Sequence, residues 1–343
     1  MGKFHEIKKL GGEVMEQFRI YYKGRVGGTF GRMVYFISPS LYYSLYAYKV
    51  YLTNQTPGSK NKSHEIKISP MQDLPPILLE IQQFFKDKNL ANCTKLIVHG
   101  SVATAETIKY SDLDVLIILS HHGLHSKKKL VKIAKALYQS EKLLKKFDPL
   151  QHHGWFILTD FDLNTYPTTY FPLELLKHSR IFSKDSPENI IVGLPNEHIH
   201  WNAPFKHTAV SLLRKLSNPK IHPTNVFTLK NLLSEFMLLP ALYMQARDKK
   251  GILKKMSFTS AKEDFEYATW EIMDKVSFIR HSWHYSMNGL QKYILTRVHP
   301  AVMRYSKFAA PRIPVEIAQQ LQPDFYSKMN LLVKQMQNKI DEL

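Results

Sequence analysis

Between residues 75 and 160, the pattern of apolar and polar residues predicts short strands that alternate with helices. After Pro75-Pro76, apolar residues recur at helical spacing as far as Phe85, and proline is well tolerated in the first turn of a helix. A longer helical pattern at residues 124–147 carries lysines along its polar face. Three runs of mostly branched apolar residues have the length of strands and lie at residues 95–98, 112–119 and 155–158. These elements predict a small sheet with helices packed against it.

From about residue 196 the strand pattern stops and only helical spacing remains. Three helices are expected here, at residues 224–247, from Ser260 toward Trp283, and from Pro323 toward Leu343. Pro240 should kink the first of them. In the second, Ser260 and Glu263 have the spacing of an N-terminal capping box. We therefore expect an α+β fold, in which a small mixed-sheet domain precedes a C-terminal helical domain.

The sequence divides into three predicted parts: an N-terminal extension, the sheet domain and the helical domain, at residues 1–75, 76–195 and 196–343. The extension is basic and aromatic, and its polar stretch at residues 53–65 predicts a loop or linker. Residues 33–52 come nearest to a membrane span, but they contain Pro39, Lys49 and six tyrosines. We therefore expect no stable membrane insertion.

Composition limits the classes of function without choosing among them. Of the 343 residues, 44% are hydrophobic, which is enough for a sizeable buried core. Lysine and arginine number 47 against 29 acidic residues, and the net charge of +18 favours polyanionic or polyphosphate partners. Cys93 is the only cysteine, which excludes an intramolecular disulfide and a cysteine-rich zinc module. The N-terminus lacks the apolar core of a signal peptide, so a cytoplasmic location is expected.

The residues with the clearest chemical signal lie between Val98 and Leu119. A strand ends in Gly100-Ser101, ten residues follow, and the next strand opens with Asp112-Leu113-Asp114. Side chains two positions apart on a strand share a face, so the two carboxylates should project together. A divalent cation relieves their repulsion, and Mg²⁺ prefers such oxygen ligands together with substrate phosphates. Gly100 and Ser101 could then cradle a phosphate, because glycine lets the backbone approach closely.

This stretch resembles the polymerase-β-like nucleotidyltransferase superfamily, whose signature is Gly-Ser, a spacer, and Asp-x-Asp at the head of a strand. The spacing is most similar to that of the minimal and aminoglycoside-type members, over roughly residues 76–162. The resemblance implies that Asp112 and Asp114 hold Mg²⁺, or Mn²⁺ in its place, against a nucleoside triphosphate. An acceptor oxygen then attacks the α-phosphorus, and pyrophosphate leaves. Lys109, between Ser101 and Asp112, is a candidate phosphate contact.

The family also implies a third carboxylate near the start of the next strand, and here the sequence departs from the pattern. The position falls where Gln151, His152 and His153 stand. Asp148, just before them, is the first candidate for the missing acid. His153 or His152 comes second, as a general base or metal ligand that would favour Mn²⁺. The last candidates lie beyond the strand, at Asp160 and Asp162.

We expect an enzyme that transfers a nucleoside monophosphate, AMP in particular, from a triphosphate such as ATP to an acceptor hydroxyl. The acceptor is a small molecule, a protein or an RNA end, and the helical domain would hold it. In two-domain relatives the helical domain also supplies cations to the triphosphate, which makes Lys254 or Lys255 a candidate.

Two alternatives stay open. An RNA 3′-end nucleotidyltransferase is favoured by the positive charge, although no recognisable RNA-binding module is present. A non-catalytic nucleotide-binding or partner protein on the same scaffold is favoured by the missing third acid. The lysines of the helix at residues 124–147 are interpreted first as a solvated face and second as a nucleic-acid stripe.

Overall fold

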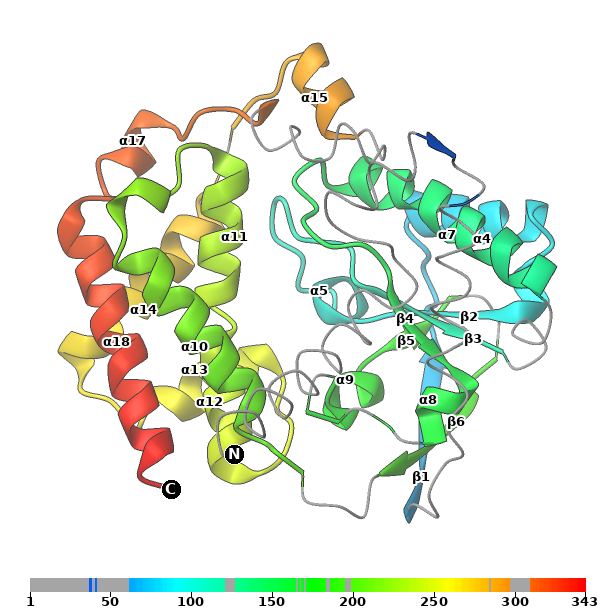
Figure 1. The fold of residues 1–343 in the computed structure, drawn as a ribbon, viewed down its shortest axis with the longest axis horizontal. Coiled ribbons are helices and arrows are strands. Elements are labelled where there is room, and N and C mark those ends of the chain that lie inside the picture. Colours follow the sequence, from blue (N-terminus) through cyan, green and yellow to red (C-terminus); the bar gives the residue numbers. More distant parts are fainter. Residues whose placement is uncertain are drawn as a thin grey trace.

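The computed structural model describes residues 37–38, 41, 62–120, 127–164, 166, 168–169, 171–182, 186–194, 199–283, 285–296 and 309–343. A mixed sheet with its helices lies on one side of Figure 1 and a group of helices on the other. The predicted α+β class with a C-terminal helical region is confirmed. Most of the tyrosine-rich stretch 33–52 lies outside the described residues. No helix within the described ranges is long and apolar enough to cross a bilayer.

Six strands form one mixed sheet in the order β4-β3-β2-β5-β1-β6. They are β1 (Lys62–Pro70), β2 (Thr94–Val98), β3 (Val115–Leu119), β4 (Phe156–Thr159), β5 (Arg180–Ile181) and β6 (Glu188–Leu194). β3 pairs with β4 in parallel, and so does β1 with β5. The ladders β2–β3, β2–β5 and β1–β6 are antiparallel.

The register of β2, β3 and β4 brings three connecting segments to one edge of the sheet. Val98 pairs with Val115 across the antiparallel ladder, so the residues after β2 meet those before β3. Leu116 pairs with Phe156 in the parallel ladder, so the residues before β4 arrive at the same edge. The segments collected there are residues 99–101, 112–114 and 151–154.

Helices cover both faces of the sheet, which explains why β2 and β3 are apolar without alternation. Leu96 and Val98 belong to one buried layer and Ile97 to the other. The helices of the first layer are α4 (Pro76–Asp87), α5 (Gly100–Ala103) and α7 (Lys127–Phe147). Those of the second are α8 (Asp160–Asn164) and α9 (Leu173–Lys177). A short 3-10 turn, η1 (Ala91–Cys93), leads into β2.

The helical region packs around an apolar core of its own. Its helices are α10 (Ala203–Leu216), α11 (Val226–Phe236), α12 (Leu239–Asp248), α13 (Lys254–Lys262), α14 (Tyr267–His281), α15 (Gly289–Leu295), α17 (Val315–Ala318) and α18 (Pro323–Asp341), with a 3-10 turn η2 (Pro219–Ile221). Trp270, Trp283 and Met329 are among its buried side chains. Leu150, from the connection before β4, is buried in the same cluster. The helical region and the edge of the sheet therefore share packed apolar contacts.

Two predicted helix features are wrong. The pattern at residues 224–247 forms two helices, and Pro240 lies in the first turn of α12, where its missing N–H removes no helical hydrogen bond. Ser260 lies inside α13, Glu263 follows that helix, and α14 begins only at Tyr267. The spacing around Pro240 predicted a kink where one helix ends and another begins, and the spacing of Ser260 and Glu263 predicted a cap that is not present. Such local patterns do not fix helix boundaries, which also depend on packing.

The sheet also begins earlier than predicted. β1 contains the last residues of the expected linker 53–65, so part of the proposed N-terminal extension 1–75 belongs to the sheet. Ile66 and Ile68 are buried, and polar residues alternate with them. Two buried positions in a mostly polar stretch are a weak signal for a strand, and the polar composition of residues 53–65 predicts a linker instead.

Candidate active site

Glycine at position 100 lets the turn after β2 press against Asp114. The N–H of His99 donates to the carbonyl of Asp114 at 3.0 Å, and Gly100 has a φ of 66°. A Cβ atom on Gly100 would lie 2.5 Å from Oδ2 of Asp114. Any other residue would therefore collide with the carboxylate and strain the backbone. The turn that carries Ser101 is thus held beside one of the two predicted metal ligands.

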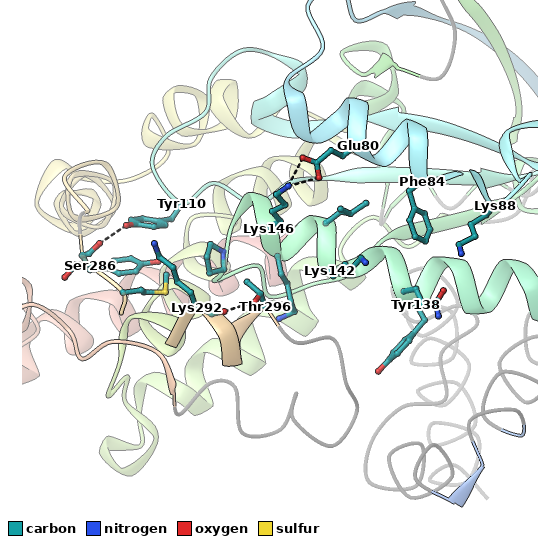
Figure 2. A pocket seen from close by; sticks show the side chains of 16 residues that line it. Glu80, Phe84, Lys88, Tyr110, Tyr138, Lys142, Lys146, Ser286, Lys292 and Thr296 are labelled. Carbon is teal, nitrogen blue, oxygen red and sulfur yellow. Dashed lines mark hydrogen bonds and ion pairs between the residues drawn. The ribbon is translucent and has the colours of Figure 1, made fainter. Parts of the chain in front are cut away.

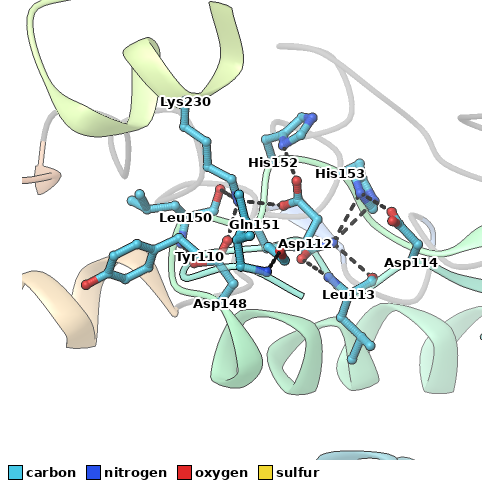
Figure 3. A network of polar contacts seen from close by, with 12 residues as sticks. Tyr110, Asp112, Leu113, Asp114, Asp148, Leu150, Gln151, His152, His153 and Lys230 are labelled. Carbon is cyan, nitrogen blue, oxygen red and sulfur yellow. Dashed lines mark hydrogen bonds and ion pairs between the residues drawn. The ribbon is translucent and has the colours of Figure 1, made fainter. Parts of the chain in front are cut away.

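Asp112 and Asp114 come just before β3 and lie on the same side of the chain (Figure 3). Leu113 between them is fully buried. Gln151 holds Leu113 in place, because its Oε1 accepts from the Leu113 N–H at 2.9 Å and its Nε2 donates to the Leu113 carbonyl at 3.2 Å. The side-chain amide of Gln151 therefore acts as a strand partner and positions the carboxylates on either side of Leu113.

Each aspartate pairs with one of two neighbouring histidines. Nδ1 of His152 lies 3.2 Å from Oδ2 of Asp112, and Nε2 of His153 lies 2.9 Å from Oδ1 of Asp114. Nδ1 of His153 is also 2.9 Å from the carbonyl of Gly154. A carboxylate and a carbonyl both accept, so His153 donates from both ring nitrogens in this arrangement. The histidines stand where the superfamily pattern calls for a third acid.

The surroundings keep both carboxylates ionised. Burial opposes the charge of Asp114, but the hydrogen bond and charge of His153 outweigh it and lower the pKa of Asp114. Burial also opposes the charge of Asp112, and Lys230 with His152 holds its pKa well below the usual range. Burial disfavours a proton on His153, yet the two aspartates raise the pKa of its imidazole above the ordinary value.

Lys230 is a fully buried cation between two carboxylates. It lies on α11, and its Nζ donates to Oδ1 of Asp112 at 2.8 Å and to the carbonyl of Leu150 at 3.3 Å. The same ammonium forms an ion pair with Asp148. A buried ammonium is costly unless it is paired, and here two carboxylates and a carbonyl satisfy it.

Asp148, the first candidate for the missing acid, lies on the far side of that ammonium from Asp112. Its side chain is only 1% exposed. One carboxylate oxygen pairs with Lys230, and the other accepts from the N–H of Leu150 at 3.0 Å. Asp148 thus positions Lys230 and the turn before β4. Its link to Asp112 is indirect, because both carboxylates pair with the same ammonium.

The role of Lys230 was not predicted, although its position in the apolar pattern of α11 is unusual for a lysine. The buried positions on α11 include Val226, Leu229 and Leu233, and Lys230 follows the same helical spacing. A lysine at a core position is rare unless it is paired, so the pattern marks it as unusual. Its partners could not be read from the sequence, because Asp112 is 118 positions away.

Arg280 ties the connection before Asp112 to the helical region. This buried residue of α14 donates to the carbonyls of Lys109 and Tyr110 at 3.0 and 2.6 Å. The side chain of Lys109, a predicted phosphate contact, lies with its Nζ 5.6 Å above the ring of Tyr110. The ring of Tyr110 stacks in turn on Tyr285, with centroids 4.0 Å apart.

Lys254 and Lys255, the cations expected from the helical domain, differ in their surroundings. Desolvation and the nearby charge of Arg280 lower the pKa of Lys254 to about 8, while the two aspartates of the site act in the opposite direction. By accessible surface both lysines are exposed, and Lys255 pairs with Glu106 at 2.5 Å, away from the aspartates. Lys254 is therefore the better placed of the two to act on a ligand at the aspartates.

Asp160 and Asp162 lie at the opposite ends of the strands from the candidate site. They follow β4, whereas the candidate site gathers the residues that precede β3 and β4. Asp162 accepts from the N–H and the hydroxyl of Thr159 at 2.7 and 2.8 Å. These bonds join the end of β4 to the start of α8, which is a structural role.

His99, the residue before Gly100, is a buried imidazole that packs as an aromatic side chain. Its ring centroid lies 5.0 Å from that of Phe156 and 4.8 Å from that of Phe171. Burial lowers the pKa of His99 to about 4, although nearby Asp114 acts against this. Its Nε2 finds no hydrogen-bond partner among the described residues. His99 is therefore neutral at physiological pH.

One known protein family matches the part of the chain that contains the candidate site. Residues 78–153 match the nucleotidyltransferase domain family, a range that includes Gly100, both aspartates and His153. No curated protein gives a significant match. A spectinomycin adenyltransferase from Enterococcus faecialis, solved with ATP and spectinomycin, is 11% identical, with 68% of this chain and 97% of that chain covered and a TM-score of 0.34. The family match shows a nucleotidyltransferase domain at residues 78–153, from α4 to the segment before β4.

Replacing Lys230 with methionine should destabilise the protein strongly, because Asp148 would be left buried without its cation. We expect a loss of about 3–5 kcal/mol in the free energy of unfolding, measured by urea denaturation. Lys334→Met on the exposed face of α18 is the control and should change this value by less than about 0.5 kcal/mol. Adding Asp148→Leu to Lys230→Met should recover much of the loss. Equal stability of Lys230→Met and the control would show that the buried pair is not formed.

His99 should make the folded protein sensitive to mild acid. Its folded pKa of about 4 lies below the ordinary value of 6.5, so the unfolded chain binds the extra proton between these values. Stability should therefore fall as pH drops from about 6.5 toward 4, by roughly 3 kcal/mol in total. His99→Leu should lose this component in urea titrations at several pH values, whereas His207→Leu, on the exposed side of α10, should retain it. Parallel acid profiles for wild type and His99→Leu would contradict the assignment.

Proposed function

We propose that the chain transfers a nucleoside monophosphate, AMP in particular, from a nucleoside triphosphate to an acceptor hydroxyl, with the help of a divalent metal. The observation that carries the proposal is the contact between the Gly100 turn and the carboxylate of Asp114, with Asp112 beside it. A surface where backbone can approach phosphate next to two ionised carboxylates suits a metal–triphosphate complex. The free thiol of Cys93 is in keeping with a reducing, cytoplasmic setting.

The donor chemistry of the site fits a hard divalent cation. No cluster of three or more His, Cys, Asp or Glu side chains suited to a metal occurs among the described residues. Asp112 and Asp114 would hold Mg²⁺ together with substrate phosphates, since Mg²⁺ needs only one or two protein carboxylates in such sites. The metal would neutralise charge on the triphosphate. The imidazole of His153 beside Asp114 would make Mn²⁺ an effective substitute.

The chain's own groups would bind and orient the triphosphate. Backbone N–H groups of the Gly100-Ser101 turn would donate to phosphate oxygens, and Lys254 would approach from the helical region. In the transfer, the acceptor oxygen bonds to the α-phosphorus as the bond to pyrophosphate breaks. Positive groups fixed around the transferring phosphoryl stabilise the charge that it carries in the transition state.

His153 is the better placed candidate to receive the acceptor's proton. It contacts Asp114 directly, whereas both oxygens of Asp148 are engaged by Lys230 and Leu150. Only neutral imidazole accepts a proton, so His153 must first lose the proton that it shares with Asp114. Gln151 and His152 would then act as positioning residues for the two aspartates.

A second function is a nucleotide-binding protein that performs no transfer. It is favoured by one observation: Lys230, His152 and His153 already contact the carboxylate oxygens that a metal would use. Nucleotide binding would then depend on Lys254 and the Gly100 turn, and no labelled product would form. Incubation with Mg²⁺, labelled ATP and candidate acceptors separates the two functions.

Asp112→Asn and Asp114→Asn should each abolish binding of Mg²⁺·ATP, measured by calorimetry, because asparagine keeps the shape and loses the charge that holds the metal. We expect at least a roughly 100-fold weaker affinity, about 2.7 kcal/mol or more. Asp73→Asn, in the exposed loop before α4, is the matched control and should bind as the wild type does. Removal of the metal with EDTA should weaken binding in wild type and control alike. Unchanged Mg²⁺·ATP affinity in both site variants would exclude this metal site.

His153→Gln should lower the rate of transfer by about 10²–10³-fold while Mg²⁺·ATP affinity changes little, as expected for loss of a general base. Because the pKa of His153 is raised, the wild-type rate should increase with pH through a value above 6.5. In His153→Gln this rise should disappear. Asp148→Asn should instead reduce stability and keep the turnover of the folded fraction. Full activity of His153→Gln would assign the proton transfer to another group.

A further inference from the structure

A lysine-rich groove runs beside the candidate active site, between two helices of the sheet layer and the segment that follows α14 (Figure 2). Its volume of about 1240 Å³ exceeds the roughly 300–1,000 Å³ usual for pockets that enclose one small ligand. α4 and α7 form one wall, and residues 285–296 form the other. We call this cavity the lysine groove.

The charge of the lysine groove is strongly positive. Five lysines line it: Lys88, Lys142, Lys145, Lys146 and Lys292. Glu80 is the one acidic side chain among the described lining residues, and it pairs with Lys146 at 2.7 Å. Lys142 and Lys292 are exposed and face the groove from opposite walls. The lysines of α7, interpreted from the sequence first as a solvated face, therefore form one side of a concave basic surface.

Aromatic rings are interleaved with these lysines. Phe84 is half-buried in the wall, with Nζ of Lys88 5.7 Å from its ring centroid. At the end nearest the candidate site, Tyr110 and Tyr285 stack with ring centroids 4.0 Å apart. Lysines that follow a phosphate backbone, together with aromatic faces for bases, are the features that bind unpaired nucleic-acid strands. A duplex would offer its phosphates but keep its bases from these rings.

We propose that the lysine groove binds single-stranded nucleic acid. The groove leads to the candidate site, because Tyr110 is two residues from Asp112, and Pro149, another lining residue, follows Asp148. The net charge of +18 would assist the encounter over a distance. This binding is independent of the proposed transfer, although a strand held there would end beside the aspartates.

The test measures binding of a fluorescein-labelled, 12-nucleotide RNA of mixed sequence to the full chain by anisotropy, as a function of salt. The variant Lys142→Glu/Lys292→Glu reverses one charge on each wall. It should weaken binding at least tenfold, and it should reduce the slope of log K against log salt by about 1.4 for two lost phosphate contacts. The control Lys220→Glu/Lys334→Glu carries the same charge change outside the groove and should bind within about threefold of wild type.

A second pair of variants tests the rings. Phe84→Leu keeps an apolar side chain and removes the stacking face, so RNA affinity should fall by roughly fivefold or more. Phe278→Leu, at a phenylalanine that is 65% exposed on α14, should leave it unchanged. An equal loss of RNA affinity in the two double-lysine variants, or an unchanged affinity in Phe84→Leu, would overturn the proposal in favour of non-specific electrostatic attraction. Binding to vesicles with 20% phosphatidylserine but not to RNA would overturn it in favour of an anionic membrane surface.

The same variants separate the groove from the proposed function. The groove variants should keep the Mg²⁺·ATP affinity of the wild type, because none of the changed residues belongs to the aspartate site. RNA binding that survives Asp112→Asn would support the groove even if ATP binding proved absent. Conversely, ATP binding without RNA binding would leave the proposed function standing and remove the groove.

Discussion

The ammonium of Lys230, buried between Asp112 and Asp148, joins the helical region to the edge of the sheet. Without this ammonium Asp148 would be buried without a cation, and without the two carboxylates the lysine would be buried unpaired. Such a triad adds little net stability compared with an apolar replacement, but its ion pairs join α11 to the segments before β3 and β4. The direction of the Asp112 carboxylate therefore depends on the docking of a helix far away in the sequence.

Other contacts also hold the segment before β3 between the helical region and the sheet. Arg280 donates hydrogen bonds to the carbonyls of Lys109 and Tyr110, and the ring of Tyr285 stacks on that of Tyr110. On the other side, Gln151 fixes Leu113 from within the sheet region. The segment that carries the aspartates is thus held by contacts from both regions. A ligand bound at the aspartates would lie where the two regions meet.

Local features of this site could be predicted from the sequence, and non-local ones could not. Gly100, Asp112 and Asp114 were predicted from the Gly-Ser and Asp-x-Asp motif, although β3 begins at Val115 and not at Asp112 as predicted, and the β2–β3 ladder brings Gly100 to Asp114. The strand β1 was hidden by its charged residues, and Ser260 imitated a cap that packing did not use. Lys230 and Arg280 act on residues more than a hundred positions away, and no periodicity reports such a distance. The position of His152 and His153 was predictable, but their choice of partners depends on the register of β3 and β4.

The balance of charge limits the form in which a triphosphate could enter. Asp112, Asp114 and Asp148 lie near the three basic side chains Lys230, Lys254 and Arg280, so the formal charges of this group balance before the histidines are counted. A polyphosphate without a metal would be repelled by the carboxylates. A divalent cation without phosphate would compete with Lys230 and His153 for the carboxylate oxygens of Asp112 and Asp114. A metal already bound to phosphate would avoid both costs, because Asp112 and Asp114 would meet a cation and Lys254 would meet the negative charge of the phosphates. All three of these cations come from the helical region, so the charge balance at the aspartates depends on how that region packs against the sheet.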